Sequence, residues 1–555
     1  MAIFHEKVDL ALNPAERTAQ TKAPESSDDV EALFSQAEEI TIGDDHGEFV
    51  VIGAGLVGAL CAIVLIRKGF KVHMYERYQD IRSIPAAGRS VNLSVTSRGL
   101  RSIRALGGSL HDDLMKLATP VSGRIIHMPS GQAVFQRYGK DDSECNYSVS
   151  RVELNRFLID ACEKAGAVIH FNHVLSETSD FSGDELVGCV LDFTCGSQRL
   201  RVKAKCPVIG CDGAGSRVRY ALRRCGLTDF SEDLLTRGYK EVLFPKPQDG
   251  VDFGAKGDDG GEVCPGSNGL HIWPRGEHML MTLVNIDGSF TGTFFMTEKG
   301  EEESFESFGD SPEGRARCTR FIEKYYNDAA PHVGGVDELV RQITTNPSGL
   351  LGTVFTSKWA IKGKVLLIGD ASHAMVPFFG QGCNCGFEDT LWLSRLLDKY
   401  CGENGVCVPE MCTGENLAAC FEALEKERKP NADAICDMAL ENFVEMRDKT
   451  GDVKFQQLKK VENRLENLYG DVFRSRYAMV CYGGDGNVSY ANAQTLGKVQ
   501  MKMLDNLIDV QDGDSEEVII FKASNIDLEK ARRLIQDEIV PLQQELGVDL
   551  STVKH

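Results

Sequence analysis

The feature that most constrains this chain is an uncharged run from Phe49 to Ile66, which is flanked by charged residues on both sides. Its length approaches the roughly 18 to 20 apolar residues that span a bilayer, so hydropathy alone would predict a transmembrane helix. The run is interrupted, however, by Gly53, Gly55 and Gly58, which follow a short β-branched segment. Glycines in this G-x-G-x-x-G spacing are typical of a buried parallel strand, a tight turn and a helix. We therefore expect a βαβ unit here and no membrane span.

Each glycine of this motif has its own predicted role in binding a dinucleotide. Gly53 permits the sharp turn, Gly55 lets backbone amides approach a pyrophosphate, and Gly58 allows the helix to pack closely on the strand. The N-terminus of the helix adds partial positive charge for the phosphates. Glu76 ends a second apolar strand, at the spacing where an acidic residue accepts a hydrogen bond from a ribose hydroxyl. The alternative is an incidental glycine-rich turn, but the agreement of strand, helix and Glu76 favours a bound dinucleotide.

Two later segments also join an apolar strand to an aspartate beside a glycine. The segment from position 208 to 219 contains Asp212, and the segment from position 364 to 373 contains Asp370. An aspartate at the carboxyl end of a strand can accept a hydrogen bond from a ribitol or ribose hydroxyl. Either segment alone is an ordinary strand-to-turn junction, so it is their combination with the glycine motif that indicates a shared cofactor.

Composition limits the remaining classes of protein. With 555 residues and 42% hydrophobic residues, the chain can form two or three packed domains and is neither disordered nor fibrous. Its net charge of −21 argues against nucleic-acid binding. The 18 cysteines show no C-x-x-C pairs or zinc-like spacing, so we expect reduced, buried thiols and no metal site. The first residues lack the apolar core of a signal peptide, and we do not expect secretion.

In this order, the three segments resemble the flavoprotein monooxygenases of the aromatic hydroxylase type, whose motifs are G-x-G-x-x-G, D-G and G-D. That family binds FAD tightly and NAD(P)H only transiently, without a second Rossmann domain. The resemblance therefore also accounts for the single dinucleotide fingerprint in this sequence.

Within that family, a closer resemblance is to the members that act on L-kynurenine, and it extends from about residue 48 to about residue 480. It implies a monooxygenase that uses FAD, NADPH and O2 to convert L-kynurenine to 3-hydroxy-L-kynurenine in tryptophan degradation. The oxygen would be delivered by a flavin C4a-hydroperoxide, without a catalytic side chain. The segments that carry this resemblance lie at positions 88–94, 147–151, 270–275 and 376–382.

The resemblance also implies the residues that contact FAD. Two positions depart from the family pattern. Ser94 stands where the family has a small apolar residue, and Cys383-Asn384-Cys385 stands where Met-Asn-Ala is usual. Both changes preserve approximate size, so they bear on the details of the FAD contacts more than on FAD binding itself. With the motif glycines and aspartates included, the expected cofactor residues are Gly53, Gly55, Val57, Gly58, Glu76, Arg77, Ser94, Arg151, Leu175, Asp212, Arg217, Asp370, Gly382, Cys383 and Asn384.

Four substrate contacts follow from the resemblance: Arg124, Tyr138, Asn442 and Tyr477. An arginine fork and a tyrosine hydroxyl suit the amino-acid carboxylate of kynurenine, at ~1.5 to 3 kcal/mol for a desolvated charge-assisted hydrogen bond. Without the resemblance, Arg124 would equally well be a surface cation.

Phe295 and Phe378 are further candidates, because either ring can pack on the aniline of kynurenine. Plain core packing is the common alternative for two phenylalanines. His373 invites the role of general base beside Asp370, but the flavin chemistry needs none. We instead expect the backbone N–H groups at Gly382, which opens a helix, to point at the flavin and favour its anionic reduced form.

The pattern of elements predicts an α/β fold, with a Rossmann-like FAD-binding domain, an inserted antiparallel β-sheet substrate domain and a C-terminal helical region. The expected parts are a flexible acidic extension at 1–47, the FAD-binding domain at 48–225 and 350–400, the substrate domain at 226–349, helices that close the substrate site at 401–482, and an acidic extension with a surface helix at 483–555.

Two other functions and two locations stay open. The chain could be another FAD-dependent aromatic or polyprenyl hydroxylase, or a non-catalytic flavin-fold carrier protein. The sequence favours the cytoplasm because no apolar run near the C-terminus is long enough to span a membrane. The family resemblance alone suggests the mitochondrial outer membrane.

Overall fold

The structure is a computed structural model, and it describes residues 37–43, 47–84, 91–139, 144–183, 188–247, 255–257, 263–264, 269–446, 452–483 and 488–553. Residues 1–36 and 44–46 of the predicted extension lie outside this set, as do positions 88–90 of the resemblance.

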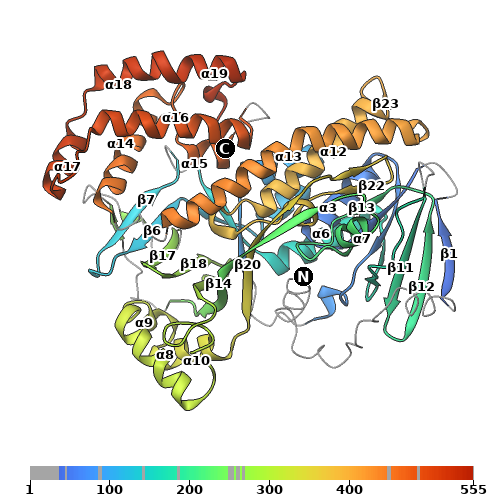
Figure 1. Ribbon diagram of the computed structural model, residues 1–555, viewed down its shortest axis with the longest axis horizontal. Helices are drawn as coiled ribbons and strands as arrows, with labels where there is room; N and C mark the ends of the chain where they lie inside the picture. Colours follow the sequence, from blue (N-terminus) through green and yellow to red (C-terminus); the bar gives the residue numbers. More distant parts are fainter. Residues whose placement is uncertain are drawn as a thin grey trace.

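A six-stranded sheet forms the nucleotide-binding part (Figure 1). All its neighbouring strands are parallel except the first pair. Its carboxyl ends therefore meet at one edge, where parallel sheets bind ligands. In spatial order the strands are β21 (Ala360–Ile361), β22 (Val365–Leu367), β13 (Val208–Gly210), β2 (Glu48–Ile52), β3 (Lys71–Tyr75) and β9 (Val168–His170).

The uncharged run at 49–66 is part of this unit, as predicted. It forms β2, a glycine turn and helix α3 (Leu56–Arg67), which packs between α6 (Arg151–Ala165) and α12 (Gly382–Tyr400). Helix α6 has a local signal at each end, because the Ser150 hydroxyl accepts from the backbone N–H of Glu153 and the left-handed Gly166 ends the helix.

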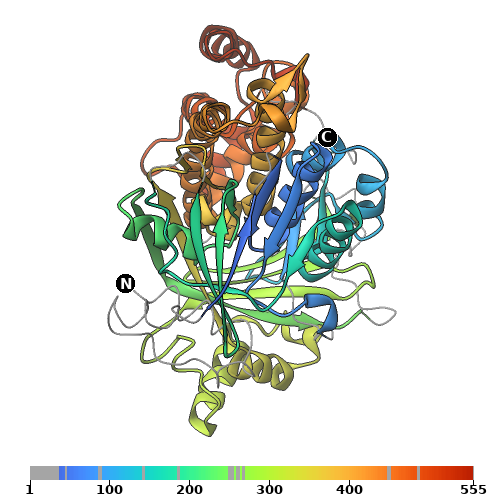
Figure 2. The same cartoon turned by 90° about the vertical axis from the view of Figure 1, so that its right-hand side faces the viewer.

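Two smaller sheets flank this unit. The three-stranded one contains β4 (Asn92–Val95), β8 (Asn146–Ser150) and β5 (Thr119–Val121). The four-stranded one contains β1 (Glu38–Ile42), β12 (Gln198–Ala204), β11 (Cys189–Cys195) and β10 (Val174–Leu175), and faces the viewer in Figure 2. Because β1 pairs in parallel with β12, the predicted flexible extension is wrong for residues 38–42.

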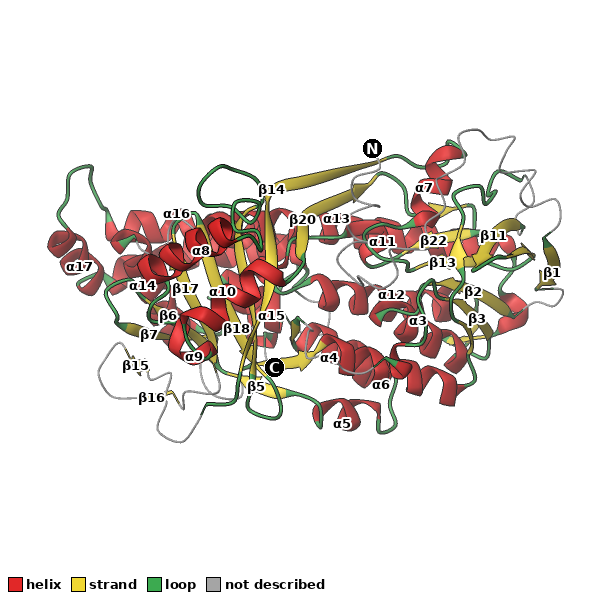
Figure 3. Ribbon diagram, turned by 90° about the horizontal axis from the view of Figure 1, so that it is seen from below, coloured by secondary structure: helices red, strands yellow, loops and turns green. Residues whose placement is uncertain are grey.

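A nine-stranded, mostly antiparallel sheet forms the second large layer (Figure 3). The substrate domain was predicted at 226–349, but the sheet also contains two earlier strands, β6 and β7, and the end of β20. Strand β6 joins the sheet because it pairs in parallel with β17. In order the strands are β16 (Val263–Cys264), β15 (Ala255–Gly257), β7 (Ala133–Arg137), β6 (Gly123–His127), β17 (Gly269–Arg275), β18 (His278–Val284), β19 (Phe290–Thr297), β14 (Phe230–Phe244) and β20 (Ser348–Thr356).

Helices α8 (Pro312–Tyr325), α9 (Ala330–Val333) and α10 (Val336–Thr345) cover one face of this sheet (Figure 3). On that face the ring of His278 contacts Phe321 of α8. On β17, Arg275 pairs with His278 and Leu270 pairs with Arg124, and these two residues of β17 are five positions apart. Because side chains alternate along a strand, Arg124 points to the opposite face.

The C-terminal helices gather at one end of the molecule, and the long helix α13 runs from there across α12 (Figure 1). The predicted extension at 483–555 is therefore wrong, because α16 packs on α13, α14 and α15. The burial of Ile535 and Ile539 also shows that this segment is not the surface helix predicted within 483–555. These helices are α13 (Gly414–Val444), α14 (Val453–Tyr469), α15 (Arg476–Tyr482), α16 (Tyr490–Ile508), α17 (Glu516–Ser524), α18 (Leu528–Leu534) and α19 (Val540–Leu546).

The remaining elements connect these layers. No helix in the described part of the chain combines the length and apolarity needed to cross a membrane. The connecting elements are α4 (Ser97–Ala105), α5 (Leu110–Met115), α7 (Arg217–Arg224), α11 (Asp370–His373), the hairpin β23 (Gly402–Glu403) and β24 (Val406–Cys407), and the 3-10 turn η3 (Pro377–Phe379).

Candidate active site

The glycine turn after β2 has the geometry of a phosphate-binding turn. Gly53 has φ +98°, and a Cβ there would lie 2.6 Å from the Cys211 carbonyl oxygen. A Cβ on Gly58 would clash with the carbonyl oxygen of Gly53. Gly55 is different, because among the described residues no heavy atom other than those of its two chain neighbours lies within 4 Å of the position its Cβ would take. Gly55 is the N-cap of α3, and no side chain caps this helix end. The open space at Gly55 therefore lies at the positive end of the helix dipole, where an anion can bind.

Glu76 lies beside this turn, at the end of β3. One carboxylate oxygen accepts from the backbone N–H of Ala54 at 2.7 Å, and the other accepts from that of Tyr78 at 2.9 Å. Asn155 of α6 donates from Nδ2 to the Ala54 carbonyl at 3.0 Å. The turn is thus held by side chains from both neighbouring elements, which fixes the direction of its backbone.

A second group of cofactor candidates lies where β22 ends. Asp370 is the first residue of α11, and its Oδ1 lies 4.0 Å from the position of a Cβ on Gly382, the first residue of α12. Burial raises the pKa of the half-buried Cys383 thiol to about 12, while the nearby Arg151 lowers it. Cys383 is therefore a neutral thiol at physiological pH. Val57 packs on Gly369 and Gly386, which joins this group to the glycine turn.

Other predicted contacts are already engaged with the protein. Both oxygens of Asp212 accept hydrogen bonds, from the Ser216 hydroxyl at 2.5 Å and from the Val218 N–H at 3.1 Å, so this carboxylate supports the start of α7. Asn384 is fully buried, with Oδ1 accepting from Thr96 N–H at 2.8 Å and Nδ2 donating to the Ser94 carbonyl at 2.8 Å. Through these hydrogen bonds, Asp212 and Asn384 fix the backbone around the predicted cofactor site.

Three further predicted residues have contacts outside the glycine turn. Leu175 is buried in β10 of the four-stranded sheet. Arg217 begins α7, with Nη1 3.9 Å from Glu177 Oε1, and its buried Nε has no hydrogen-bond partner among the described atoms. Arg77 has its guanidinium carbon 4.8 Å from the centroid of the Tyr78 ring.

The residues present fit FAD. Open space over Gly55 leaves room for a pyrophosphate, and Glu76 is an acceptor at the neighbouring strand end. The unpartnered Nε of Arg217 supplies a buried cationic donor. Gly53, Gly55, Glu76 and Arg217 would hold the cofactor in that arrangement, with Asp370 and Gly382 at its other end.

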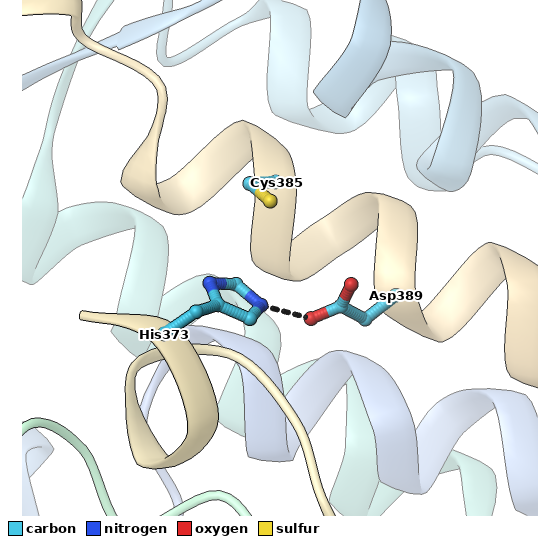
Figure 4. Close-up of side chains that lie close together, drawn as sticks. All are labelled: His373, Cys385 and Asp389. Atoms are coloured by element: carbon cyan, nitrogen blue, oxygen red, sulfur yellow. Dashed lines mark hydrogen bonds and ion pairs between the residues drawn. The ribbon is translucent and has the colours of Figure 1, made fainter. Parts of the chain in front are cut away.

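His373, Cys385 and Asp389 form a buried group behind this edge, with ligand atoms within 4.8 Å of one another (Figure 4). His373 Nε2 lies 2.7 Å from Asp389 Oδ2, which also accepts from the Gly369 N–H at 3.0 Å. Arg428 donates to Asp389 Oδ1 at 2.8 Å and lies 3.3 Å from Cys385 Sγ. Since a fixed cation there would repel a metal ion, we assign this group the role of anchoring the turn after β22.

Three of the predicted substrate residues meet on the face of the large sheet away from α8. The rings of Tyr138 and Tyr477 stack with centroids 4.8 Å apart. The guanidinium carbon of Arg124 lies 5.0 Å from the Tyr477 centroid and 5.7 Å from that of Tyr138. Burial raises the pKa of both phenols, which are therefore neutral hydrogen-bond donors. This arrangement offers a cation and hydroxyls to an anionic group.

The predicted aromatic residues form a cluster beside them. Phe295 pairs with Met279, the neighbour of His278, so it shares the face of Arg124. Its ring centroid lies 5.1 Å from that of Phe378 in η3. Asn442 of α13 is buried, and its Nδ2 donates to the Phe378 carbonyl at 2.7 Å, so it holds η3 in place. Since η3 ends three residues before Gly382, the aromatic cluster lies next to the cofactor side.

Sequence reasoning missed Asn146, Asn155 and Tyr239. The ring centroid of Tyr239 is 6.2 Å from that of Phe295, and its pKa responds to Arg151, so it lies between the aromatic cluster and the cofactor side. Asn146 begins a strand with alternating polar residues of which two are buried. For Asn146 the available signal in the sequence was a strand in which every second residue is polar. The sequence offers no comparable signal for Asn155 or Tyr239.

Comparison with known families and proteins agrees with this geometry. Residues 47–271 and 287–406 match the family described as FAD binding domain. A kynurenine 3-monooxygenase of Myxococcus xanthus is 38% identical over 89% of this chain and 96% of its own length. A kynurenine 3-monooxygenase of Flavobacterium johnsoniae is 35% identical over 90% of this chain and 99% of its own.

Solved structures share the fold at low sequence identity. Klebsiella pneumoniae HpxO, complexed with FAD and uric acid, matches with a TM-score of 0.54 at 19% identity, over 76% of this chain and 93% of its own. A 2-methyl-3-hydroxypyridine-5-carboxylic acid oxygenase matches with a TM-score of 0.53 at 18% identity, over 73% and 94%. The predicted α/β architecture is therefore confirmed.

Proposed function

The chain belongs to the FAD binding domain family and to the family of kynurenine 3-monooxygenases, and on this premise we propose that it hydroxylates L-kynurenine to 3-hydroxy-L-kynurenine. The proposed enzyme holds FAD tightly and uses NADPH and O2 as co-substrates. Its place is a step of tryptophan degradation.

The observation that carries the proposal is the surroundings of Arg124. Among the described residues no carboxylate is hydrogen-bonded to its guanidinium, whose buried Nε has no hydrogen-bond partner. The rings of Tyr138 and Tyr477 flank the guanidinium, and Glu445 is near enough to raise its pKa. A half-buried arginine whose guanidinium no carboxylate contacts directly favours an anionic ligand, because a carboxylate supplies charge-assisted hydrogen bonds. L-Kynurenine has such a carboxylate at one end and an aniline ring at the other.

The work that we propose for the protein is binding and orientation. The chemistry that FAD supplies when bound is electron uptake from NADPH and activation of O2. Arg124, Tyr138 and Tyr477 would hold the carboxylate, while Phe295 and Phe378 would pack on the ring and exclude water. Asn442 would act indirectly, by fixing η3.

We also propose a division of labour along the chain. Residues 48–225 and 350–400 would form the FAD-binding domain, apart from β6 and β7, which join the substrate sheet with β20. The helices from 401 to 482 would close the substrate side. The cytoplasmic location stays a prediction, and the mitochondrial one gains no support from the relatives named above, which are bacterial.

The test is the rate of NADPH oxidation by the purified, FAD-loaded protein with each member of a panel of aromatic acids. We expect L-kynurenine to accelerate oxidation and to yield a product with one added oxygen atom. Acceleration by a different aromatic compound alone would indicate another hydroxylase. Failure to take up FAD would indicate a carrier protein. Repeating the assay with NADH measures the preference for the nicotinamide donor.

A further inference from the structure

The turn between η3 and α12 is held from inside the protein by amide side chains. The successive carbonyl groups of residues 378–380 each accept a hydrogen bond from one of them. The donors, in that order, are Asn442 at 2.7 Å, Gln381 at 3.4 Å and Asn384 at 2.8 Å, and all three are buried. Because the N–H of a trans peptide points away from its C=O, the direction of these carbonyls also sets the direction of the N–H groups that follow them.

Of these three amides, Gln381 is held by a residue far along the chain. Tyr490, the first residue of α16, is fully buried, and its hydroxyl donates to Gln381 Oε1 at 2.9 Å. The Phe379 carbonyl can only accept, so Gln381 Nε2 faces it and Oε1 is left for Tyr490. Gln381 Nε2 also lies 3.6 Å from the Sγ of Cys481, which leaves the acceptor role of Oε1 unchanged.

Tyr490 is itself held in one place. The guanidinium carbon of Arg98 lies 4.2 Å from the centroid of its ring, which is a cation–π contact. Arg98 in turn pairs with Glu388 of α12 at 3.1 Å. Tyr490 therefore has a fixed position relative to α12, and it can fix Gln381 there.

Gln381 is the N-cap of α12, but its side chain makes no capping hydrogen bond to the helix, because it is turned to Tyr490. The N–H groups of the first turn, which begins at Gly382, lie at the positive end of the helix. Reduction adds electrons to a bound flavin, so donors that point at it favour the reduced form. A Gln381 that is free to turn would carry the backbone at this helix end with it.

We propose that Tyr490 is a positioning residue for the cofactor. By holding the Gln381 amide, it keeps the N–H groups at the start of α12 directed at the bound flavin, and it thereby raises the reduction potential of that flavin. This inference rests on the proposed function, because it takes FAD as the cofactor. It also gives the helices after position 483 a part in the active site.

Three variants separate this role from simple packing. Tyr490→Phe removes the hydroxyl and keeps the ring beside Arg98. Gln381→Met keeps the length of the side chain and removes its amide, so the hydroxyl loses its target. Tyr326→Phe is the control, because Tyr326 at the end of α8 is equally buried and its hydroxyl lies 2.8 Å from His278 Nδ1, on the other face of the large sheet.

The measurement is the midpoint potential of the flavin in the FAD-loaded protein without L-kynurenine, with the melting temperature recorded beside it. We expect Tyr490→Phe to lower the ratio of reduced to oxidised flavin at a given potential about three- to tenfold, since one hydrogen bond is lost. For a two-electron couple this is a midpoint potential lower by about 14 to 30 mV. Tyr326→Phe should leave the potential unchanged although it also loses a buried hydrogen bond. In the Gln381→Met background, Tyr490→Phe should have no additional effect.

The outcomes are distinguishable from failure of the proposed function. A wild-type protein that takes up no FAD would overturn both. A protein that holds FAD but does not hydroxylate L-kynurenine would overturn the proposed function alone, because the titration contains no kynurenine. An unchanged potential in Tyr490→Phe, or an equal shift in Tyr326→Phe, would overturn the inference alone. If Tyr490→Phe does not fold, the potential of Gln381→Met decides, and it should be lower than that of the wild type.

Discussion

Two glycines of one motif differ in what surrounds them. A side chain on Gly58 would meet the protein itself, at the carbonyl of Gly53, whereas a side chain on Gly55 would enter space that is open in the part of the chain that the structure describes. The motif alone assigns both to the cofactor. The structure separates a glycine needed for the fold from one whose space is left for a ligand.

Replacing Gly55 by alanine should therefore weaken FAD binding without unfolding the protein. Because the new methyl group contacts none of the described residues beyond its chain neighbours, we expect the melting temperature of the FAD-free protein to stay within about 2 °C of the wild type. We expect FAD affinity to fall by about tenfold or more. The measurements are calorimetry of the FAD-free protein and titration with FAD. Gly58→Ala is the comparison, and it should lower the melting temperature itself; a Gly55→Ala variant with wild-type affinity would contradict this role.

Arg124 gives the second prediction at this scale. Arg124→Met should raise KM for L-kynurenine roughly tenfold to a hundredfold, because one charge-assisted fork contributes about 1.5 to 3 kcal/mol. Arg124→Lys keeps the charge but not the fork, so its KM should lie between that of the wild type and that of Arg124→Met. Steady-state kinetics measure both. An unchanged KM in Arg124→Met would exclude contact between this residue and the carboxylate.

At the level of residues, the sequence predicted those site residues whose positions are set by the local backbone. The three glycines and Glu76 lie where expected, because the turn and two adjacent strands determine them. Nothing in the sequence indicated that the Asp212 carboxylate also accepts hydrogen bonds from the first turn of α7, and its predicted contact with the cofactor stays a prediction. Asn146 was missed because its hydrogen-bond partner, the Tyr477 hydroxyl, lies 331 residues away.

At the scale of elements, local signals and distant pairing gave different results. The start and end of α6 follow from two local signals in the sequence, the capping Ser150 and the C-terminal Gly166. Strand β1 was not predicted, because its five residues are stabilised by β12, about 160 residues later. For the helices after position 483 the sequence predicts a surface extension, because their charged faces dominate the sequence, whereas in the structure α16 and α17 pack on α13 and α14.

Helix α14 carries a prediction about pH. Burial raises the pKa of Glu466 to about 7, although Arg474 Nε lies 2.9 Å away and lowers it. The ordinary value is 4.5, so between these pH values the folded state keeps a proton that the unfolded state has released. The contribution is fully present below about pH 4.5 and is lost as pH rises through about 7, by up to about 3 kcal/mol.

Glu466→Gln does not titrate, so it should gain stability relative to the wild type as pH rises. We expect the difference in melting temperature, variant minus wild type, to be more positive at about pH 8 than at about pH 5. Glu529→Gln, an exposed position on α18, is the control and should show no such trend. A constant difference for Glu466→Gln across this range would mean that the ion pair with Arg474 holds the carboxylate charged throughout.

Across the whole molecule, Arg98 joins the cofactor side to the C-terminal helices. It is 1% exposed, and Nη1 lies 3.1 Å from Glu388 Oε1. Its other nitrogens donate to backbone carbonyls at the end of α15, including Val480 at 2.6 Å, and to that of Val488. The segment that carries Tyr477 is thus fixed to α4 and, through Glu388, to α12.

Arg98→Met should destabilise the protein by about 3 to 5 kcal/mol, because it leaves several buried acceptors without a partner. Denaturant unfolding of the FAD-loaded protein measures this. Arg532→Met is the matched control on the exposed face of α18 and should change stability by less than about 0.5 kcal/mol. A loss for Arg98→Met no larger than that of the control would contradict the proposed link.

The most direct test of the central claim is the mass of the product formed under isotopically labelled oxygen. Purified protein loaded with FAD, and supplied with NADPH, L-kynurenine and ¹⁸O₂, should yield 3-hydroxy-L-kynurenine that carries one ¹⁸O atom. Unlabelled product in the presence of ¹⁸O₂, or unaltered L-kynurenine with a fully FAD-loaded protein, would contradict the claim that this chain is an O2-using kynurenine hydroxylase.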